Sequence, residues 1–292
     1  MAISDLSLFN SMAFALDTTT ANIQNIQQEV ASGKQVVQPS DNLVNYGQAQ
    51  LLSARASAVN NDINTGQQVQ GLLTSADNSL ASVGNWVNSA ISIATQGADG
   101  TMNTSNMSTL GAQVQSILQQ VIGEGNTQYA GAQLFAGSQT NTTPYDPSGN
   151  YAGDSGTNFA TFSDGTKIQT TFDGQAILGD ANSGLIGTLT SLQNALQTGN
   201  QTAVAATLSQ LQASLQSVAT ARGNIGINEQ SLQNFLSNAN TESTTLQTSI
   251  SSLTDADVAQ LALDQQQALL QEQALVSMAS GLGKIPLVNI LT

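Results

Sequence analysis

The chain contains no cysteine and no histidine. It therefore cannot form a disulfide, a thiolate nucleophile, a His-based catalytic triad or an imidazole metal ligand. Its 19 acidic residues outnumber the five lysines and arginines, and the formal net charge is −14. Nucleic-acid binding depends on Lys and Arg neutralising phosphates, so this balance argues against a nucleic-acid partner or an anionic membrane surface. We expect a protein that is not an enzyme and that holds no metal and no cofactor.

Aromatic residues and charged residues are also scarce. They make up 4% and 8% of the chain, whereas about 25% of residues are charged in a typical soluble domain. Small aliphatic side chains supply most of the apolar residues and suit thin interfaces between helices. No run of 18 apolar residues occurs, and the N-terminus has neither the basic nor the apolar region of a secretory signal. Any export is therefore expected to proceed without a cleaved signal peptide.

Helical periodicity over long stretches dominates what is present. After a first step of four, apolar residues recur at alternating spacings of three and four, which is the pattern of a helix packed lengthwise on another helix. The only other stretches able to pair with this one lie near the C-terminus, which favours a rod, bundle or filament subunit over a compact enzyme. The residues are Val69, Leu73, Ala76, Leu80, Val83, Val87, Ala90 and Ala94, of which Val69, Leu73, Leu80, Val83 and Val87 are the candidate helix-seam residues.

Before this stretch, the chain carries a signal for one helix to stop and another to start. Gly33 is expected to end the first helix in a left-handed conformation, and Pro39 forces its predecessor out of the helix. Ser40 or Asp41 can cap the next helix. Residues 43–95 then read as one long helix. A loop over 96–106 and a helix ending at Gly123 and Gly125 follow.

The middle of the chain has a different composition and lacks the long helical pattern. Residues 129–184 are richer in aromatics, and Asp164-Gly165 and Asp173-Gly174 are typical hairpin turns. Four side chains could suggest a calcium loop, but the glycine and distal glutamate of an EF-hand are missing, and a solvated turn explains them better. These four are Asp146, Ser148, Asn150 and Asp154.

Helical patterns return at residue 185, stop at Gly223–Gly226 and resume at Leu232. Thr254 to Asp257 resembles a helix start, and Pro286 is expected to end the last helix. The predicted fold is mainly α: a long antiparallel helical bundle or coiled coil formed by N- and C-terminal segments, with a small β-rich insertion in the middle. The expected divisions are terminal helices at 1–45 and 258–292 that are mobile until assembly, a helical rod at 46–128 and 185–257, and an outer β-rich insertion at 129–184.

Four stretches resemble the flagellin superfamily, and within it the hook–filament junction type (FlgL type, hook-associated protein 3). The first is Ser32-Gly33-Lys34 with Pro39-Ser40-Asp41, although Gln35, Asn42 and Leu43 depart from the family pattern. The second is Leu134-Phe135-Ala136-Gly137 with Pro144-Tyr145. The third runs from Arg222 through Gly226 and Asn228 to Leu232. The fourth includes Asp255, Asp257, Ala259, Gln266 and the tail 288–291. The candidate motif positions are Gly33, Pro39, Ser40, Asp41, Phe135, Gly137, Arg222 and Gly226.

The resemblance implies a structural, secreted protein of the bacterial flagellum that takes part in motility. It would form an adapter ring by self-assembly, with the hook-associated protein below and flagellin above. It also implies type III export without a cleaved signal peptide, an extracellular location, and an export chaperone for the C-terminal helix. The alternative is a divergent flagellin that forms the filament itself.

Overall fold

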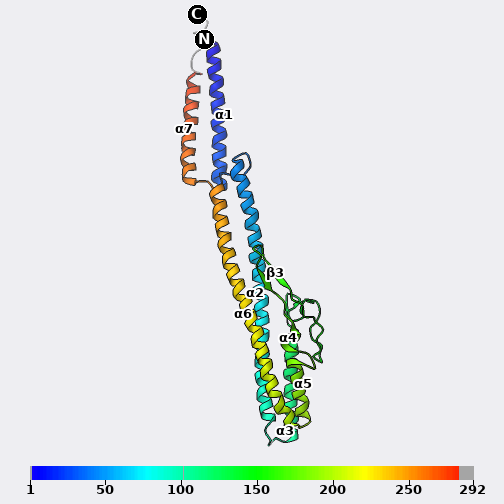
Figure 1. Cartoon of the computed structure of the whole chain (residues 1–292). Coiled ribbons are helices and arrows are strands. Elements are labelled where there is room, and N and C mark those ends of the chain that lie inside the picture. Colours follow the sequence, from blue (N-terminus) through cyan, green and yellow to red (C-terminus); the bar gives the residue numbers. More distant parts are fainter. Residues whose placement is uncertain (1, 101, 283–292) are drawn as a thin grey trace. The chain divides into compact units, whose positions relative to one another are not determined.

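The structure is a computed structural model that describes residues 2–100 and 102–282 (Figure 1). Long helices dominate it and two small antiparallel sheets interrupt them, which confirms the predicted mainly α fold with a small β insertion. Pro286 and the apolar tail at 287–291 lie outside the described residues. The elements are α1 (Ala2–Ser32), α2 (Leu43–Gly97), α3 (Thr104–Gly125), β1 (Gln128–Tyr129), β2 (Ala132–Gln133), β3 (Phe159–Thr161), β4 (Lys167–Gln169), α4 (Gly174–Leu178), α5 (Gly184–Gln197), α6 (Gln201–Thr254) and α7 (Val258–Leu282).

The chain divides into two compact units. The first contains the described residues of 1–57 and 243–292, and the second contains 58–242. Helices α2 and α6 contribute residues to both. No described helix combines the length and apolar character needed to cross a membrane.

In the second unit, α2 and α6 run antiparallel, side by side (Figure 1). Gly66 of α2 faces Leu232 and Leu236 of α6, whereas Gly97 at the other end of α2 faces Val204 near the start of α6. The middle of α2 therefore lies beside the later part of α6, and the end of α2 lies beside the start of α6, as in an antiparallel pair. This confirms that the stretch from residue 69 to 94 lies against the C-terminal third of the chain.

Helices α3 and α5 pack against each other and complete the helical core of the second unit. Apolar side chains at helical spacing make α5 the most deeply buried helix, because Leu185, Ile186, Leu189, Leu192 and Leu196 are all fully buried. Gly111 of α3 faces Gln193 and Leu196, so the lack of a side chain allows the two helices to approach closely.

The insertion contains two short hairpins. Strands β1 and β2 pair antiparallel, and β3 pairs with β4 so that Ala160 lies opposite Ile168. The turn predicted at Asp164-Gly165 is confirmed, since Gly165 has φ +88° between β3 and β4. The second predicted turn is wrong: Asp173 caps the short helix α4, and its carboxylate accepts a hydrogen bond from the backbone N–H of Ala176.

In the first unit, two chain junctions lie side by side. The segment after α1 (Gly33–Val36) pairs with the segment between α6 and α7 (Thr254–Ala256). Three backbone hydrogen bonds join them, from Gln35 N and Val36 N to Thr254 O and from Ala256 N to Gly33 O. Gly33 has φ +67°, which confirms the predicted left-handed conformation at the end of α1.

Two local expectations are wrong. Asn42, rather than Ser40 or Asp41, caps α2, because its side chain accepts hydrogen bonds from the N–H groups of Val44 and Asn45. In addition, α6 continues through Gly223–Gly226 without a break. Both glycines have open space where a Cβ would be, and the flanking apolar residues keep the helix packed.

Candidate assembly interface

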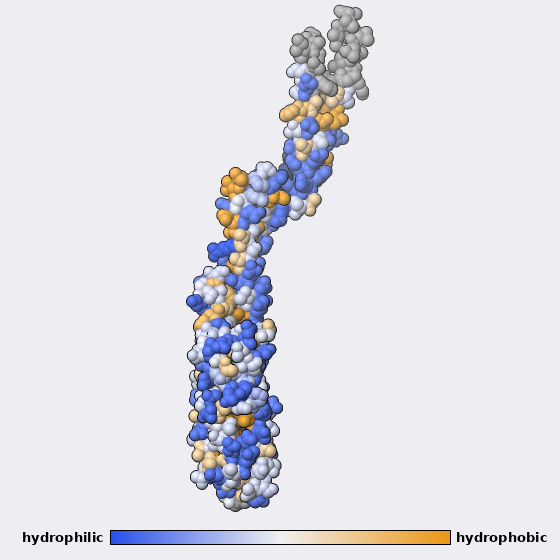
Figure 2. Space-filling model, turned by 90° about the vertical axis from the view of Figure 1, so that its right-hand side faces the viewer, coloured by the Kyte–Doolittle hydropathy of each residue, from blue (hydrophilic) through white to orange (hydrophobic). Residues whose placement is uncertain are grey.

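The first unit exposes a large share of its apolar side chains. Among large hydrophobic residues that the structure describes as exposed, all but Phe159 and Ile227 belong to this unit. In Figure 2 the hydrophobic side chains gather on its helices, while the visible face of the second unit is mostly hydrophilic. Exposed apolar patches of this kind mark interaction sites. The exposed residues are Leu8, Phe14, Val30, Val37, Leu43, Val44, Leu51, Val258, Leu263, Leu269, Leu270, Val276 and Met278.

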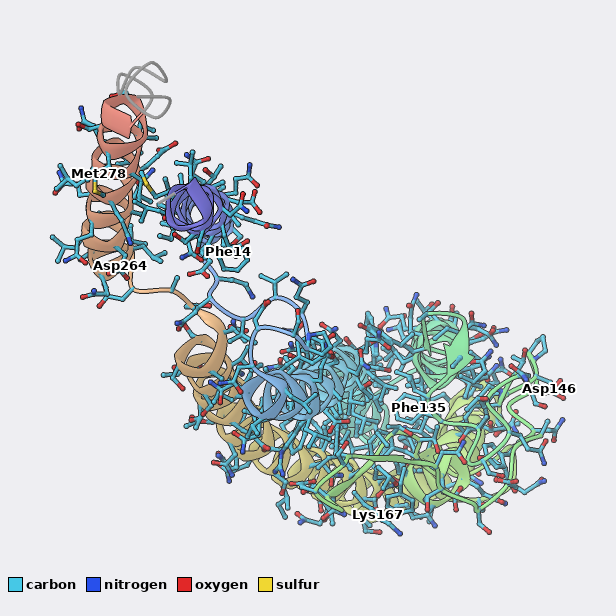
Figure 3. The ribbon with its side chains drawn as sticks, turned by 90° about the horizontal axis from the view of Figure 1, so that it is seen from above. Phe14, Phe135, Asp146, Lys167, Asp264 and Met278 are labelled. Atoms are coloured by element: carbon cyan, nitrogen blue, oxygen red, sulfur yellow. The ribbon has the colours of Figure 1, made fainter. Side chains whose placement is uncertain are left out.

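Helices α1 and α7 pack against each other but cover little of one another. Ile23 is buried on α1, and Leu261 and Ala268 are buried on α7. By contrast, Phe14 of α1 is 75% exposed and Met278 of α7 is 54% exposed (Figure 3). Each such side chain would contribute about 1.5–3 kcal/mol if fully buried. Much of the apolar surface of this helix pair is therefore available to a partner.

The same two helices carry negative charges only. Helix α1 contains Asp5, Asp17 and Glu29, and α7 contains Asp264 and Glu272, with no lysine or arginine on either helix. The pKa of Glu29 is raised by partial burial and by the nearby carboxylates of Asp41 and Asp264. Pairing of α1 with α7 thus places like charges close together.

This arrangement predicts a pH dependence. A carboxyl group whose pKa is raised by folding stabilises the folded state below its unfolded pKa of about 4.3, and that contribution is lost as pH rises through the folded value. We expect Glu29→Gln to raise the melting temperature of the helices slightly at pH 7 and to have no effect near pH 3.5. Circular dichroism melts of both proteins at the two pH values measure this. A difference that grows on acidification would contradict it.

The wild-type protein has to be compared with the Glu29→Gln variant because the pKa values of other carboxyl groups are lowered, whereas that of Glu29 is raised. Hydrogen bonds from the N–H groups of Val37 and Gln38 lower the pKa of Asp41, and the Ser251 hydroxyl lowers the pKa of Asp255. Asp257 caps α7 by accepting from Ala259 N and Gln260 N, which confirms the helix start predicted there. Only the difference between the two proteins isolates Glu29.

The candidate seam residues lie on the buried face of α2 in the second unit. Val69 is 5% exposed, and Leu73, Leu80, Val83 and Val87 are fully buried. Close to this face, Arg222 of α6 forms a two-point ion pair with Asp77 of α2, with Nε–Oδ1 at 2.8 Å and Nη2–Oδ2 at 3.0 Å. Both side chains are partly exposed, so the pair fixes register more than it adds stability.

The stretch Leu134–Gly137 forms the centre of the insertion. Phe135 is fully buried, and its carbonyl accepts hydrogen bonds from Gly174 N and the Tyr151 hydroxyl. Burial raises the pKa of Tyr151 to about 12, so this hydroxyl remains a donor at neutral pH. Gly137 has φ +70° and donates to Phe172 O. In Figure 3 Phe135 lies inside the unit, while Asp146 and Lys167 lie at its edge.

The remaining candidate positions are exposed. Pro39, Ser40 and Asp41 are exposed in the first unit, and Gly226 is exposed on α6 of the second unit, one helical turn after Arg222. Asp146 accepts hydrogen bonds from Ser148 N and Asn150 N, and Asp154 accepts from Ser138 N and Gly156 N. These two carboxylates therefore close turns. No group of three possible metal-binding His, Cys, Asp or Glu residues occurs in the described residues.

Sequence reasoning missed the partner of Arg222 and the exposed apolar start of α2. With five basic residues in the chain, each one is a strong candidate for an acidic partner, and the antiparallel register selects Asp77. Leu43, Val44 and Leu51 share one helix face at spacings of seven and eight, a signal that was readable from the sequence.

Residues 3–140 match the family model described as the bacterial flagellin N-terminal helical region. This part of the chain therefore resembles the N-terminal region of bacterial flagellins. The match includes α2, α3 and nearly all of α1, so it covers the first of the four stretches that carried the resemblance and the Leu134–Gly137 part of the second. No curated protein sequence matches the chain.

Solved structures of flagellar hook-associated proteins and of FlgL share the fold. A protein of Vibrio parahaemolyticus assigned as flagellar hook-associated is 19% identical, with a TM-score of 0.69 over 74% of this chain and 100% of that one. FlgL of Bacillus cereus is 21% identical, with a TM-score of 0.60 over 69% and 97%. Hook-associated protein 3 of Legionella pneumophila is 14% identical, with a TM-score of 0.60 over 70% and 97%. These likenesses confirm the recognised fold.

Proposed function

We propose that this protein is a structural component of the bacterial flagellum: an adapter ring that joins the hook-associated protein below to the flagellin filament above. The match of residues 3–140 to the flagellin N-terminal region carries the proposal. The fold shared with hook-associated proteins supports it, as do the exposed apolar side chains of the first unit. In this role the protein needs no catalysis and no cofactor.

Self-association follows from the same surface. A helix pair that leaves Phe14, Leu270 and Met278 largely exposed gains free energy by burying them against further copies. A head-to-tail contact between identical copies forms a ring when the rotation closes and a helical stack when it does not. The second unit, with its buried α2 face at Val69–Val87, acts as the stiff rod between such contacts, and the insertion at 129–184 faces outward.

The proposal includes the route of export. The protein leaves the cell by type III export without a cleaved signal peptide, assisted by a chaperone that covers the C-terminal helix, and functions outside the cell. Exposed Leu263, Leu269 and Val276 on α7 are the apolar residues that such a chaperone would cover before assembly.

Deletion of the gene tests the proposal. We expect cells with hooks but no filaments, and flagellin released into the medium, because filament growth requires the junction. A plasmid copy should restore filaments. Normal filaments in the deletion strain would contradict the proposal. The protein composition of sheared filaments distinguishes this proposal from the alternative that the protein is a flagellin. A filament-forming flagellin would be the main protein of the filaments, whereas a junction protein would be a trace component.

Hydrogen exchange of the purified monomer tests the behaviour of the terminal segments. We expect fast exchange over residues 5–30 and over α7, because a pair that buries so few side chains opens easily. Exchange over α2 residues 69–94 should be at least about a hundredfold slower, as expected for a buried core helix. Strong protection at residues 5–30 would show that α1 needs no partner copy.

A further inference from the structure

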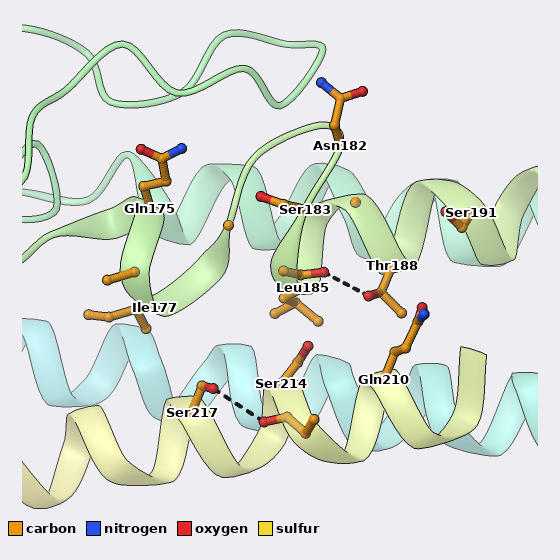
Figure 4. A pocket seen from close by; sticks show the side chains of 15 residues that line it. Gln175, Ile177, Asn182, Ser183, Leu185, Thr188, Ser191, Gln210, Ser214 and Ser217 are labelled. Atoms are coloured by element: carbon orange, nitrogen blue, oxygen red, sulfur yellow. Dashed lines mark hydrogen bonds between the residues drawn. The ribbon is translucent and has the colours of Figure 1, made fainter. Parts of the chain in front are cut away.

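A groove lies between the α4–α5 segment and α6 in the second unit (Figure 4). Its volume is about 490 Å³. Leu185 and Ile177 form its apolar part, small residues such as Gly187 and Ala213 widen it, and uncharged polar side chains surround it. These polar residues are Gln175, Asn182, Ser183, Thr188, Ser191, Gln210, Ser214 and Ser217.

Ser214 provides the first sign of an occupant. It is only 8% exposed, and its side chain points from α6 toward α5 in the groove (Figure 4). Thr188 and Ser217 satisfy their hydroxyls by donating to the carbonyls of Gly184 and Ala213. No hydrogen bond within the described residues involves the Ser214 hydroxyl. The Ser214 oxygen is not among the fully buried unpaired side-chain atoms, so it reaches the solvent of the groove and can donate to or accept from an occupant.

The charge pattern provides the second sign. Residues 181–221 contain no charged side chain, and this is the longest uncharged stretch in the chain. It includes all of α5 and the part of α6 that lines the groove. Two copies that each carry a net charge of −14 repel one another, so surfaces free of charge are where they can approach most closely. A small anion or cation would find no opposite charge in the groove lining.

We propose that this groove receives an uncharged, polar segment of a second copy of this chain and thereby forms a lateral contact of the ring. This inference rests on the proposed function. The Ser and Gln side chains of the groove can both donate and accept, which suits a backbone segment or Ser, Thr, Asn and Gln side chains. Such residues cover most of this protein's own surface. No aromatic ring lines the groove, which disfavours a sugar as occupant.

Two charge variants on the same helix test the groove. Ala213 is exposed and lines the groove, while Ala205 is exposed on α6 and does not line it. Ala213→Glu places a charge where the second copy would dock, whereas Ala205→Glu adds the same charge elsewhere. Expressed in the deletion strain, Ala213→Glu should reduce the number of filaments by about tenfold or more, since an unpaired charge in an interface is strongly unfavourable. Ala205→Glu should restore them.

Both purified variants should melt like the wild-type protein, because both sites are exposed. If Ala213→Glu restores filaments as well as the wild type, the groove is not a contact, although the proposed function stands. If the deletion strain itself has normal filaments, the proposed function fails.

Photo-crosslinking identifies the occupant. A benzophenone amino acid in place of Ser217, in intact flagella, should yield a product of twice the chain mass that contains only this protein. Products with another protein alone, or no product, would overturn the assignment of a second copy.

Discussion

Leu80→Asp is expected to unfold the second unit or bring it close to unfolding. Leu80 is fully buried on the face of α2 that packs within the helical core. Loss of a buried leucine side chain costs about 2–5 kcal/mol, and an unpaired buried charge adds a further penalty of several kcal/mol. The sum reaches the total stability of many domains, which is about 5–15 kcal/mol. Urea or thermal unfolding followed by circular dichroism measures the loss.

Two further variants separate the causes. Leu80→Ala removes the side chain without adding a charge and should cost about 2–5 kcal/mol. Asn85→Asp adds the same charge at an exposed position of α2 and should change stability by less than about 0.5 kcal/mol. An unchanged melting temperature for Leu80→Asp would show that α2 does not pack there, and the predicted pairing of distant helices would be wrong.

The helices were predictable because their information is repetitive. The apolar residues from Val69 to Val87 all indicate the same continuous apolar helix face. The prediction of a helix therefore does not depend on any one of them. The partner could be inferred as well, since α6 is among the few stretches with a matching face. The register could not be inferred, because it depends on single contacts such as Gly66 with Leu236 and Asp77 with Arg222.

Turns and caps were less predictable because the same residue types serve several purposes. Asp-Gly begins a hairpin turn at Asp164, yet Asp173 before a glycine caps helix α4. The two sites also differ in a long-range contact, because Gly174 N donates to Phe135 O and the local sequence around Asp173 does not specify this hydrogen bond. Similarly, the Asp41 carboxylate accepts hydrogen bonds from the N–H groups of Val37 and Gln38, and Asn42 caps α2 instead.

The candidate interface was only partly readable from the sequence. Exposed apolar residues on α1 and α7 look like core residues in a sequence, and only burial distinguishes Ile23 from Phe14. The groove beside Ser214 depends on how α5 lies against α6, which is a tertiary property. The lack of charge over 181–221 is, by contrast, a property of the sequence itself, and this stretch includes α5 and the part of α6 that line the groove.

Gly137→Ala should be strongly destabilising, because a methyl group at this position has neither a favourable backbone conformation nor space. Gly137 has φ +70°, which costs a residue with a Cβ about 1–2 kcal/mol. A Cβ there would also collide with the backbone oxygen and the carboxylate of Asp154. Asp154 cannot move easily, because Ser138 N, Gly156 N and the Tyr151 hydroxyl all bond to it. We expect a total loss of about 3–4 kcal/mol from conformational strain and overpacking together.

Gly165→Ala is the matched control, because Gly165 also has a positive φ of +88° but has no atom within 4 Å of the added Cβ. It should lose only the conformational part, about 1–2 kcal/mol. The difference between the two unfolding free energies, measured in urea, therefore isolates the collision with Asp154. Equal losses would show that the segment around Asp154 yields to the methyl group, and the Leu134–Gly137 stretch would then be a less rigid centre of the insertion than its hydrogen bonds indicate.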